Sequence, residues 1–226
     1  MTLRLVTGHV RLPSADFYRP PEDFERFSKR LLSAPVEKSI FAEWPLEACW
    51  LRQYIDMHGR EPTVSQGPGC NPKKDTLDYF TILAQKTEWM RLAHEKDPIA
   101  DKYVWMDYGI YHQDGFTEDL VADFLKSADN TFSTIDMPGI WAKTTGVSDT
   151  EPCWRFLGSM FVCPADQVVK FDATVKAEYA KKLLEDNLVL WDVNNWARVE
   201  LQDKLPIRWY GAGHNSSMLT NYGLIQ

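Results

Sequence analysis

A single aspartate, Asp107, is the first candidate for a chemical role, because it ends a stretch typical of a buried strand. Residues 103–107 read YVWMD, and Gly109 marks a place where the backbone turns or approaches another group closely. Ligands of open α/β sheets bind just beyond the carboxyl ends of strands. Asp107 is therefore a candidate ligand for a hard metal ion or a sugar hydroxyl. The alternative is an aspartate that only caps the loop after the strand.

A lysine interrupts the apolar face of the helix expected over residues 76–95. Residues at i, i+3 and i+4 spacing form this face: Ile82, Leu83, Lys86, Trp89, Met90 and Ala93. Lys86 either extends along the face to solvent or directs its ammonium group at a bound anion. Because the helix leads directly into the strand of Asp107, its inner face should border the same cleft. The second interpretation therefore predicts that Lys86 pairs with a phosphate.

The segment before this helix is a second candidate anion site. Residues 63–75 read TVSQGPGCNPKKD and form a turn-rich loop. Asn71 and Lys74 lie near the helix N-terminus, which attracts anions. The alternative is an exposed polar loop without a ligand.

Three further candidates lie in the second half of the chain. Asp192 and Asn194 follow a short apolar run within LVLWDVNNWAR, where a strand is expected to give way to a helix. His214 follows two glycines in GAGHNSSML, which can bend the backbone and present the imidazole, although a histidine in a glycine loop can also lack a function. Gly158, in the middle of WRFLGSMFVCP, indicates a bulge or a ligand lying against the backbone.

Strands and helices alternate along the chain, which predicts one α/β domain. The expected strands cover residues 3–7, 39–42, 103–107, 132–135, 154–163 (a strand pair or a bent strand) and 207–210. A first helix of about three turns is expected to begin near residue 21. Further helices are expected at 46–58, 76–95, 117–128 and 164–186. The sequence MPG at 137–139 is expected to break a strand. Thr7 and Gly8 end the first strand and lead into a ligand-facing loop.

Composition and charge exclude several classes of protein. The formal net charge of −7 disfavours a broad grip on nucleic acid, although Arg4, Arg11, Lys73, Lys74 and Arg91 could form a local basic groove. The four cysteines form no CxxC pair, so we expect no zinc cluster, and we expect the thiols to be reduced. No signal peptide and no apolar run of about 18 residues is present. We therefore expect a soluble, cytoplasmic protein without a membrane span.

Common catalytic motifs are absent from the sequence. It contains no GxGxxG, GxxxxGK[ST], GxSxG or HExxH pattern. What remains is a set of carboxylates at strand ends, one glycine-flanked histidine and many aromatic residues. This inventory suits a hard divalent cation that holds a diphosphate, because Mg²⁺ and Mn²⁺ take oxygen ligands and leave positions for phosphate.

The motifs, taken in their order along the chain, resemble a known family. YVWMDYGIYH, the preceding QKTEWMRLA, and the later WRFLGSMFVCP, LVLWDVNNWARVE and WYGAGHNSSML are similar to the HtrL/YibB (WlaTC-like) family, over residues 4–222. Its members resemble GT-A glycosyltransferases, which hold a nucleoside-diphosphate sugar on a Rossmann-like sheet. The resemblance implies a three-layer α/β/α fold with a mostly parallel sheet in a single domain, 1–226. Residues 1–112 would bind the nucleotide sugar and residues 113–226 would face the acceptor.

The resemblance also implies roles for individual residues. Asp107 stands at the metal-binding acidic motif and His214 at the C-terminal histidine that often completes the metal site, so the cofactor would be Mn²⁺ or Mg²⁺. Asp192 stands at the acidic residue near the acceptor and would be the general base. The residues expected near the donor, a UDP-sugar by preference, are Thr7, Gly8, Asn71, Lys74, Lys86, Asp107 and Gly109. Those expected on the acceptor side are Gly158, Trp191 and Asn194.

Several alternatives stay open at this point. GT-A enzymes commonly carry DxD, whereas WMDYG has one aspartate, so the site either binds metal through Asp107, His214, water and diphosphate oxygens or works without metal. The acceptor is a saccharide of a polysaccharide or lipopolysaccharide, or a modified base in DNA. Sugar transfer either inverts or retains the anomeric configuration. The competing functions are a nucleotide-sugar binding protein without turnover and a metal-dependent diphosphate or phosphodiester hydrolase.

Overall fold

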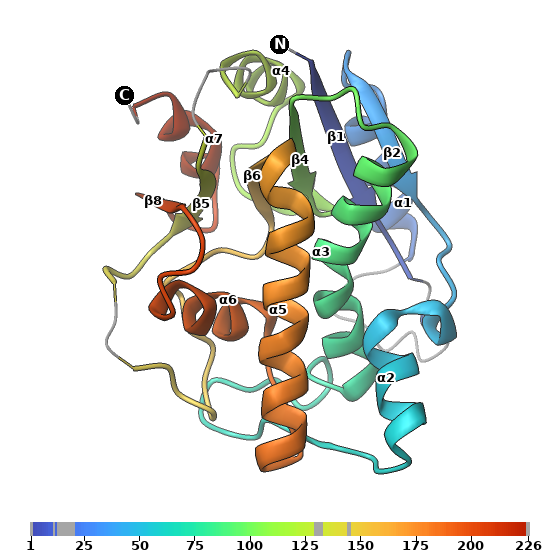
Figure 1. The fold of residues 1–226 in the computed structure, drawn as a ribbon. Helices are drawn as coiled ribbons and strands as arrows, with labels where there is room; N and C mark the ends of the chain where they lie inside the picture. The colour runs from blue at the N-terminus through green and yellow to red at the C-terminus, as the bar shows by residue number, and fades with distance from the viewer. Residues whose placement is uncertain (1, 11, 13–20, 129–132, 144–145, 225–226) are drawn as a thin grey trace.

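A six-stranded sheet forms the centre of the protein (Figure 1). The computed structural model describes residues 2–10, 12, 21–128, 133–143 and 146–224. The strand order is β2-β1-β4-β6-β5-β8, and β6 runs antiparallel to both of its neighbours whereas the other pairs are parallel. The strands are β1 (Leu3–Gly8), β2 (Glu37–Phe41), β4 (Lys102–Met106), β5 (Ile135–Gly139), β6 (Met160–Pro164) and β8 (Ile207–Gly211).

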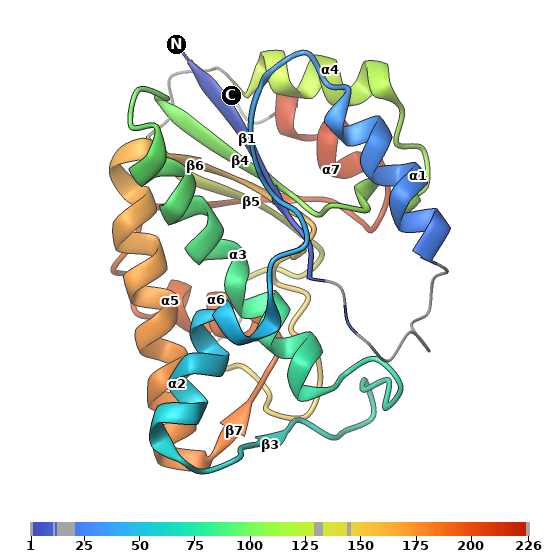
Figure 2. The same ribbon diagram turned by 90° about the vertical axis from the view of Figure 1, so that its right-hand side faces the viewer.

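Helices cover both faces of this sheet, as Figure 2 shows. On one face lie α2 (Trp50–His58), α3 (Leu77–Lys96), α5 (Ala165–Asp186) and α6 (Asp192–Leu201). On the other lie α1 (Pro21–Leu32), α4 (Glu118–Ser127) and α7 (Ser217–Thr220). Short 3-10 turns span Leu46–Ala48, Ile110–His112 and Tyr222–Leu224. The predicted three-layer α/β/α class with a mostly parallel sheet is therefore confirmed.

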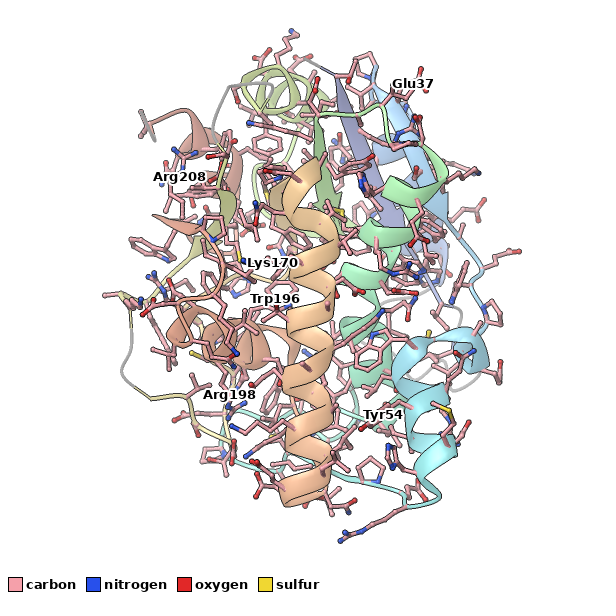
Figure 3. All side chains as sticks on the ribbon, viewed as in Figure 1. Glu37, Tyr54, Lys170, Trp196, Arg198 and Arg208 are labelled. Atoms are coloured by element: carbon pink, nitrogen blue, oxygen red, sulfur yellow. The ribbon has the colours of Figure 1, made fainter. Side chains whose placement is uncertain are left out.

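Alternation along the strands divides the core into two clusters. Tyr103 and Trp105 of β4 face α3 and α5, whereas Val104 and Met106 face α4. All residues of β4 are buried, as expected for a central strand covered on both faces. On the first face, Trp196 of α6 packs against Phe161 of β6, with ring centroids 5.3 Å apart, behind α5 (Figure 3).

The local predictions succeeded for the elements with strong periodicity and failed where a turn residue lies inside a strand. The long helices α3 and α5 begin within one residue of their predicted starts. The predicted strand at 154–163 is wrong in its first half: only β6 is a strand, and residues 154–159 form two turns with a bend between them. The predicted break at 137–139 is also wrong. These residues complete β5, where Pro138 pairs in register with Tyr210 of β8.

A smaller parallel pair lies away from the main sheet. β3 (Thr63–Val64) pairs with β7 (Leu188–Val189), so the first two residues of the segment predicted as loop form a short strand. The predicted start of the strand at residue 132 and the predicted contribution of Arg11 to a basic groove lie outside the described residues. Among the helices that the structure describes, none is long and apolar enough to cross a membrane.

The strand order creates a crevice beside β1. The chain passes from β1 to β2 on one side and later returns to β4 on the other. Ligands of open α/β sheets bind outside the carboxyl ends of strands at such a reversal of order. Val6 pairs with Trp105, so Gly8 at the end of β1 and Asp107 just beyond β4 reach the same edge of the sheet.

Candidate active site

A cleft with a volume of about 1370 Å³ opens at this edge of the sheet. Gly8, the loop after β4, the inner face of α3 and the start of α6 form its walls. The predicted site residues that line it are Gly8, Asn71, Lys74, Lys86, Asp107, Gly109, Gly158, Trp191, Asp192 and His214. The fold thus brings together residues from both halves of the chain.

Two predicted residues lie elsewhere in the part of the chain that the structure describes. Thr7 is fully buried within β1 and does not line the cleft, because strand alternation turns its side chain into the core. Asn194 is also fully buried. Its amide oxygen accepts a hydrogen bond from the backbone N–H of Cys153 (2.8 Å), and its amide nitrogen donates to the carbonyl oxygen of Glu151 (2.8 Å). Asn194 therefore fastens a loop and does not face an acceptor.

Lys86 is the centre of the first group of charged residues in the cleft. Its Nζ lies 2.8 Å from the carbonyl oxygen of Gly158, 2.9 Å from Asp192 Oδ2 and 3.2 Å from Asp107 Oδ1. The contact with Gly158 is a hydrogen bond, and the contacts with the two carboxylates are ion pairs. Lys86 therefore does not extend to solvent, and it holds two carboxylates from different elements at one point.

The charges of this cluster do not balance. One ammonium faces two carboxylates, and Asp107, whose side chain is 31% exposed, is the one that meets solvent in the cleft. Burial alone lowers the pKa of Lys86, but Asp107 and Asp192 outweigh it and raise that pKa above its usual range. Burial raises the pKa of Asp192, and Lys86 only partly opposes this. Asp192 is therefore a better proton acceptor than a solvated aspartate.

Trp105 and Trp89 hold Asp107 in place. The indole N–H of Trp105 donates to Asp107 Oδ1 (3.0 Å), and the Trp105 ring stacks on Trp89 of α3 with centroids 5.6 Å apart. A Cβ atom at Gly8 would lie 2.5 Å from the Trp89 ring. Gly8 is therefore needed so that β1 can pass this stack, which explains the glycine without a nucleotide contact.

Gly158 and Asp192 meet at the back of the cleft. A Cβ atom at Gly158 would lie 2.9 Å from Asp192 Oδ2 and 3.3 Å from Lys86 Nζ, so only glycine leaves room for the cluster. Asp192 is the first residue of α6, where the helix dipole favours a negative charge. Its Oδ1 accepts a hydrogen bond from the backbone N–H of Val193 (2.9 Å).

A second group of residues lines the cleft around Trp154 and His214. The Trp154 ring and the His214 imidazole meet edge to face, with centroids 4.7 Å apart. Burial lowers the pKa of His214, and the nearby His112 and Lys74 lower it further. Residues 112–114 lie near His214, because Asp114 and Asn215 form an isolated parallel β-bridge. Lys74 extends over the ring of Tyr79, with its Nζ 5.0 Å from the centroid.

The described side chains do not complete a metal site by themselves. Among the described residues, no group of three or more His, Cys, Asp or Glu side chains is placed to hold a metal ion. Mg²⁺ commonly binds through one or two carboxylates together with substrate phosphates. Asp107 fits that pattern because it is partly exposed and belongs to a cluster with excess negative charge.

Sequence patterns did not single out three residues that line the cleft: Asp75, Tyr79 and Trp154. Asp75 and Tyr79 belong to the turn and helix start around Thr76, where the sequence drew attention to Asn71 and Lys74. Trp154 was assigned to a strand. Trp154 instead lies in a turn, where a large aromatic side chain can contact a ligand, and the strand prediction did not suggest this.

Sequence comparisons add no family to this description. No protein-family model matches the chain, and no curated protein matches it. The membership in the HtrL/YibB family therefore stays a prediction.

Two solved structures align with most of the chain. A glycosyltransferase involved in the glycosylation of the major capsid of PBCV-1 aligns with a TM-score of 0.47 and 9% identity, over 94% of this chain and 81% of that one. A CMP:2-keto-3-deoxy-manno-octonic acid synthetase complexed with CTP aligns with a TM-score of 0.45 and 10% identity, over 100% of this chain and 98% of that one. Because both TM-scores are below 0.5, we infer function from the cleft itself.

Proposed function

We propose that this protein is a glycosyltransferase, which moves a sugar from a nucleoside-diphosphate sugar to a hydroxyl acceptor. The observation that carries the proposal is the cluster of Lys86, Asp107 and Asp192 at the carboxyl ends of β1 and β4. One carboxylate of this cluster is partly exposed and the other is buried with a raised pKa. In an inverting transfer, a buried carboxylate can take the acceptor proton, and an exposed carboxylate can hold a cation that stabilises the leaving diphosphate.

Asp192 is the residue that we assign to the acceptor proton. In an inverting transfer, a carboxylate oxygen of Asp192 takes the proton of the acceptor hydroxyl, and the acceptor oxygen bonds to the anomeric carbon. The bond from that carbon to the phosphate oxygen breaks, and the nucleoside diphosphate leaves with the bonding electrons. The raised pKa of Asp192 supports the first step, because a more basic carboxylate accepts a proton more readily.

Lys86 has a part that the sequence did not predict. Its ammonium charge is already paired with two carboxylates within the protein. We assign it as a positioning residue that keeps Asp107 and Asp192 together while contributing positive charge beneath the donor. Asp107 and His214 would hold Mn²⁺ or Mg²⁺ together with donor oxygens. When bound, that ion supplies charge stabilisation of the leaving diphosphate.

The acceptor alternatives differ in the charge that they require. A DNA acceptor needs free cations along its backbone. Arg4 is paired with Asp97, and Arg91 is paired with Glu88. These two arginines, which the sequence proposed for a basic groove, are therefore neutralised within the protein. A hydrolase with one or two metals needs several converging carboxylates, and the described residues offer no group of three ligands.

The first test is thermal melting with a panel of nucleoside diphosphates and their sugars, UDP-sugars first, with Mn²⁺ or with a chelator. A ligand present at 100 times its Kd stabilises the folded state by about 2.7 kcal/mol, which corresponds to about 5–10 °C for this chain length. We expect such a shift with one nucleotide class, and its loss in Asp107→Asn. Asp123→Asn, on the exposed side of α4, is the matched control.

The same panel separates turnover from binding. Asp192→Asn should retain the thermal shift. It should no longer transfer the sugar to an acceptor or, more slowly, to water. Absence of a shift with every nucleotide in the wild-type protein would refute the proposal. A shift without any cleavage of the donor would instead identify a nucleotide-sugar binding protein.

A further inference from the structure

Asp75 is a buried carboxylate in the wall of the cleft that the proposed transfer does not use. Its side chain is 2% exposed, and it directly precedes Thr76, the N-cap of α3. Oδ2 accepts a hydrogen bond from the backbone N–H of Asn71 (2.7 Å). Oδ1 has no hydrogen-bond partner, and Lys74 Nζ lies 3.7 Å from it, which is beyond hydrogen-bond distance. A buried acceptor atom without a donor is costly, so a ligand that supplies O–H or N–H groups is favoured here.

Two aromatic side chains, Tyr79 and Trp154, line the same cleft as this carboxylate. The loop before α3 packs on the chain that leads to Trp154: Cys70 Sγ lies 3.9 Å from the carbonyl oxygen of Thr150, and a Cβ atom at Gly69 would lie 2.6 Å from Pro152. Tyr79 lies one helical turn from Asp75, beneath the ammonium group of Lys74. A carboxylate beside aromatic rings presents hydrogen-bond acceptors and apolar surface together, which matches the hydroxyls and C–H face of a sugar ring.

This place adjoins the reacting groups. Burial is the main cause of the raised pKa of Tyr79, and the charges of Lys86, Asp192, Asp107 and Asp75 all act on its phenol. Tyr79, Asp75 and the cluster around Lys86 also line one cleft, so Tyr79 is within electrostatic range of both. A sugar whose reactive hydroxyl meets Asp192 can place other hydroxyls at Asp75.

We propose that Asp75, with the rings of Trp154 and Tyr79, forms a subsite for the hydroxyls of a saccharide acceptor. This rests on the proposed glycosyltransferase function, and it selects the saccharide over the modified DNA base. The Asp75 carboxylate repels phosphate and largely offsets the charge of Lys74. A nucleic acid backbone would therefore gain little binding free energy at this end of the cleft.

The test uses saturation-transfer NMR of the full chain with methyl hexopyranosides and simple disaccharides as probes. The wild-type protein should transfer saturation to the sugar ring. Asp75→Asn and Trp154→Leu should each weaken binding about tenfold, because a hydrogen bond to a charged group or an apolar platform is lost. Asp78→Asn and Trp141→Leu, at positions that do not line the cleft, should bind as the wild type does.

The outcomes separate this subsite from the donor site. Loss of saccharide binding in both variants, with the nucleotide-dependent thermal shift retained, supports the proposal. Unchanged binding in Trp154→Leu overturns it, even if Asp75→Asn is unstable, and so does binding of no saccharide by the wild type. An oligonucleotide with hydroxymethylated bases that binds in place of saccharides, and depends on Trp154, also overturns it. A missing nucleotide shift in the wild type, with saccharide binding retained, would instead refute the glycosyltransferase function and leave a saccharide-binding site at Asp75.

Discussion

Lys86 decides the geometry of the candidate site at the scale of single residues. It lies in the middle of α3, yet its ammonium group reaches a carbonyl oxygen after a turn, a carboxylate beyond β4 and a carboxylate that starts α6. Its side chain is only 5% exposed, so water does not replace any of these contacts. The pairing offsets the cost of burying Asp192, which would otherwise be an isolated charge.

We expect Lys86→Met to reduce the free energy of unfolding by about 3–5 kcal/mol, because removing one partner of a buried ion pair leaves the other charge unpaired. Urea unfolding at neutral pH measures this loss. The double variant Lys86→Met with Asp192→Asn should recover part of it, since the uncompensated charge is then also gone.

Lys170→Met provides the matched control for this prediction. Lys170 lies on the exposed side of α5 (Figure 3) and should tolerate the change within about 0.5 kcal/mol. Equal stability losses at Lys86 and Lys170 would show that the cluster does not hold the cleft together.

The packing of α3 against α5 is the main contact between helices, and it has charges at its edge. Glu88 and Arg91 of α3 meet Asp172 and Lys176 of α5. The hydroxyl of Thr87 also donates to Asp172 (2.9 Å). This network fixes the position of α3 along α5, and Lys86 precedes it by one residue. The element that carries the central lysine is thus anchored next to the site.

The pH dependence of stability follows from Glu88 at this interface. Burial raises the pKa of Glu88, but the hydrogen bonds from Arg91 and Lys176 outweigh it and lower that pKa to about 2, against 4.5 for the unfolded chain. The stabilisation is therefore complete above pH 4.5 and is lost as the pH falls toward 2. Between pH 4.5 and 2, the free energy of unfolding of Glu88→Gln should fall by about 2 kcal/mol less than that of the wild type.

Urea unfolding at several pH values between 2 and 6 tests this prediction. Glu185→Gln, on the exposed surface of α5, is the control and should follow the wild type. If Glu88→Gln loses stability as steeply as the wild type does when the solution is acidified, Glu88 is not the group that senses acid at this interface.

The two halves of the chain share one sheet at the scale of the whole molecule. β4, from residues 102–106, pairs with β6, from residues 160–164, so the predicted donor half and acceptor half meet through backbone hydrogen bonds. β1, β4 and β6 each contribute to the hydrophobic clusters on both faces. Neither half can keep its core without the other.

We therefore expect a single cooperative unfolding transition. Far-ultraviolet circular dichroism and tryptophan fluorescence should give the same midpoint in urea, because the buried tryptophans Trp89, Trp105 and Trp196 belong to the core on one face of the sheet. Two separate midpoints, or a stable fragment covering only residues 113–226, would contradict the single domain.

Local sequence patterns were sufficient for the long helices, for the central strand and for several residues of the site. Apolar periodicity predicted α3 and α5, and the buried strand before Asp107 is β4. These predictions succeeded because helix and strand periods depend on neighbouring residues alone. The position of a charged residue after a strand or within an apolar helix face likewise indicated Asp107 and Lys86 before any contact was known.

Only the tertiary structure decided which of these residues meet. Lys86 and Asp192 are 106 positions apart, yet their atoms are 2.9 Å apart, because α3 and α6 pack on the same face of the sheet. Thr7 and Asn194 looked like site residues but are buried away from the cleft, and Asp75 and Trp154 became visible only as parts of its wall. Strand order, the reversal of β6 and the direction of each side chain depend on long-range packing, which local periodicity does not contain.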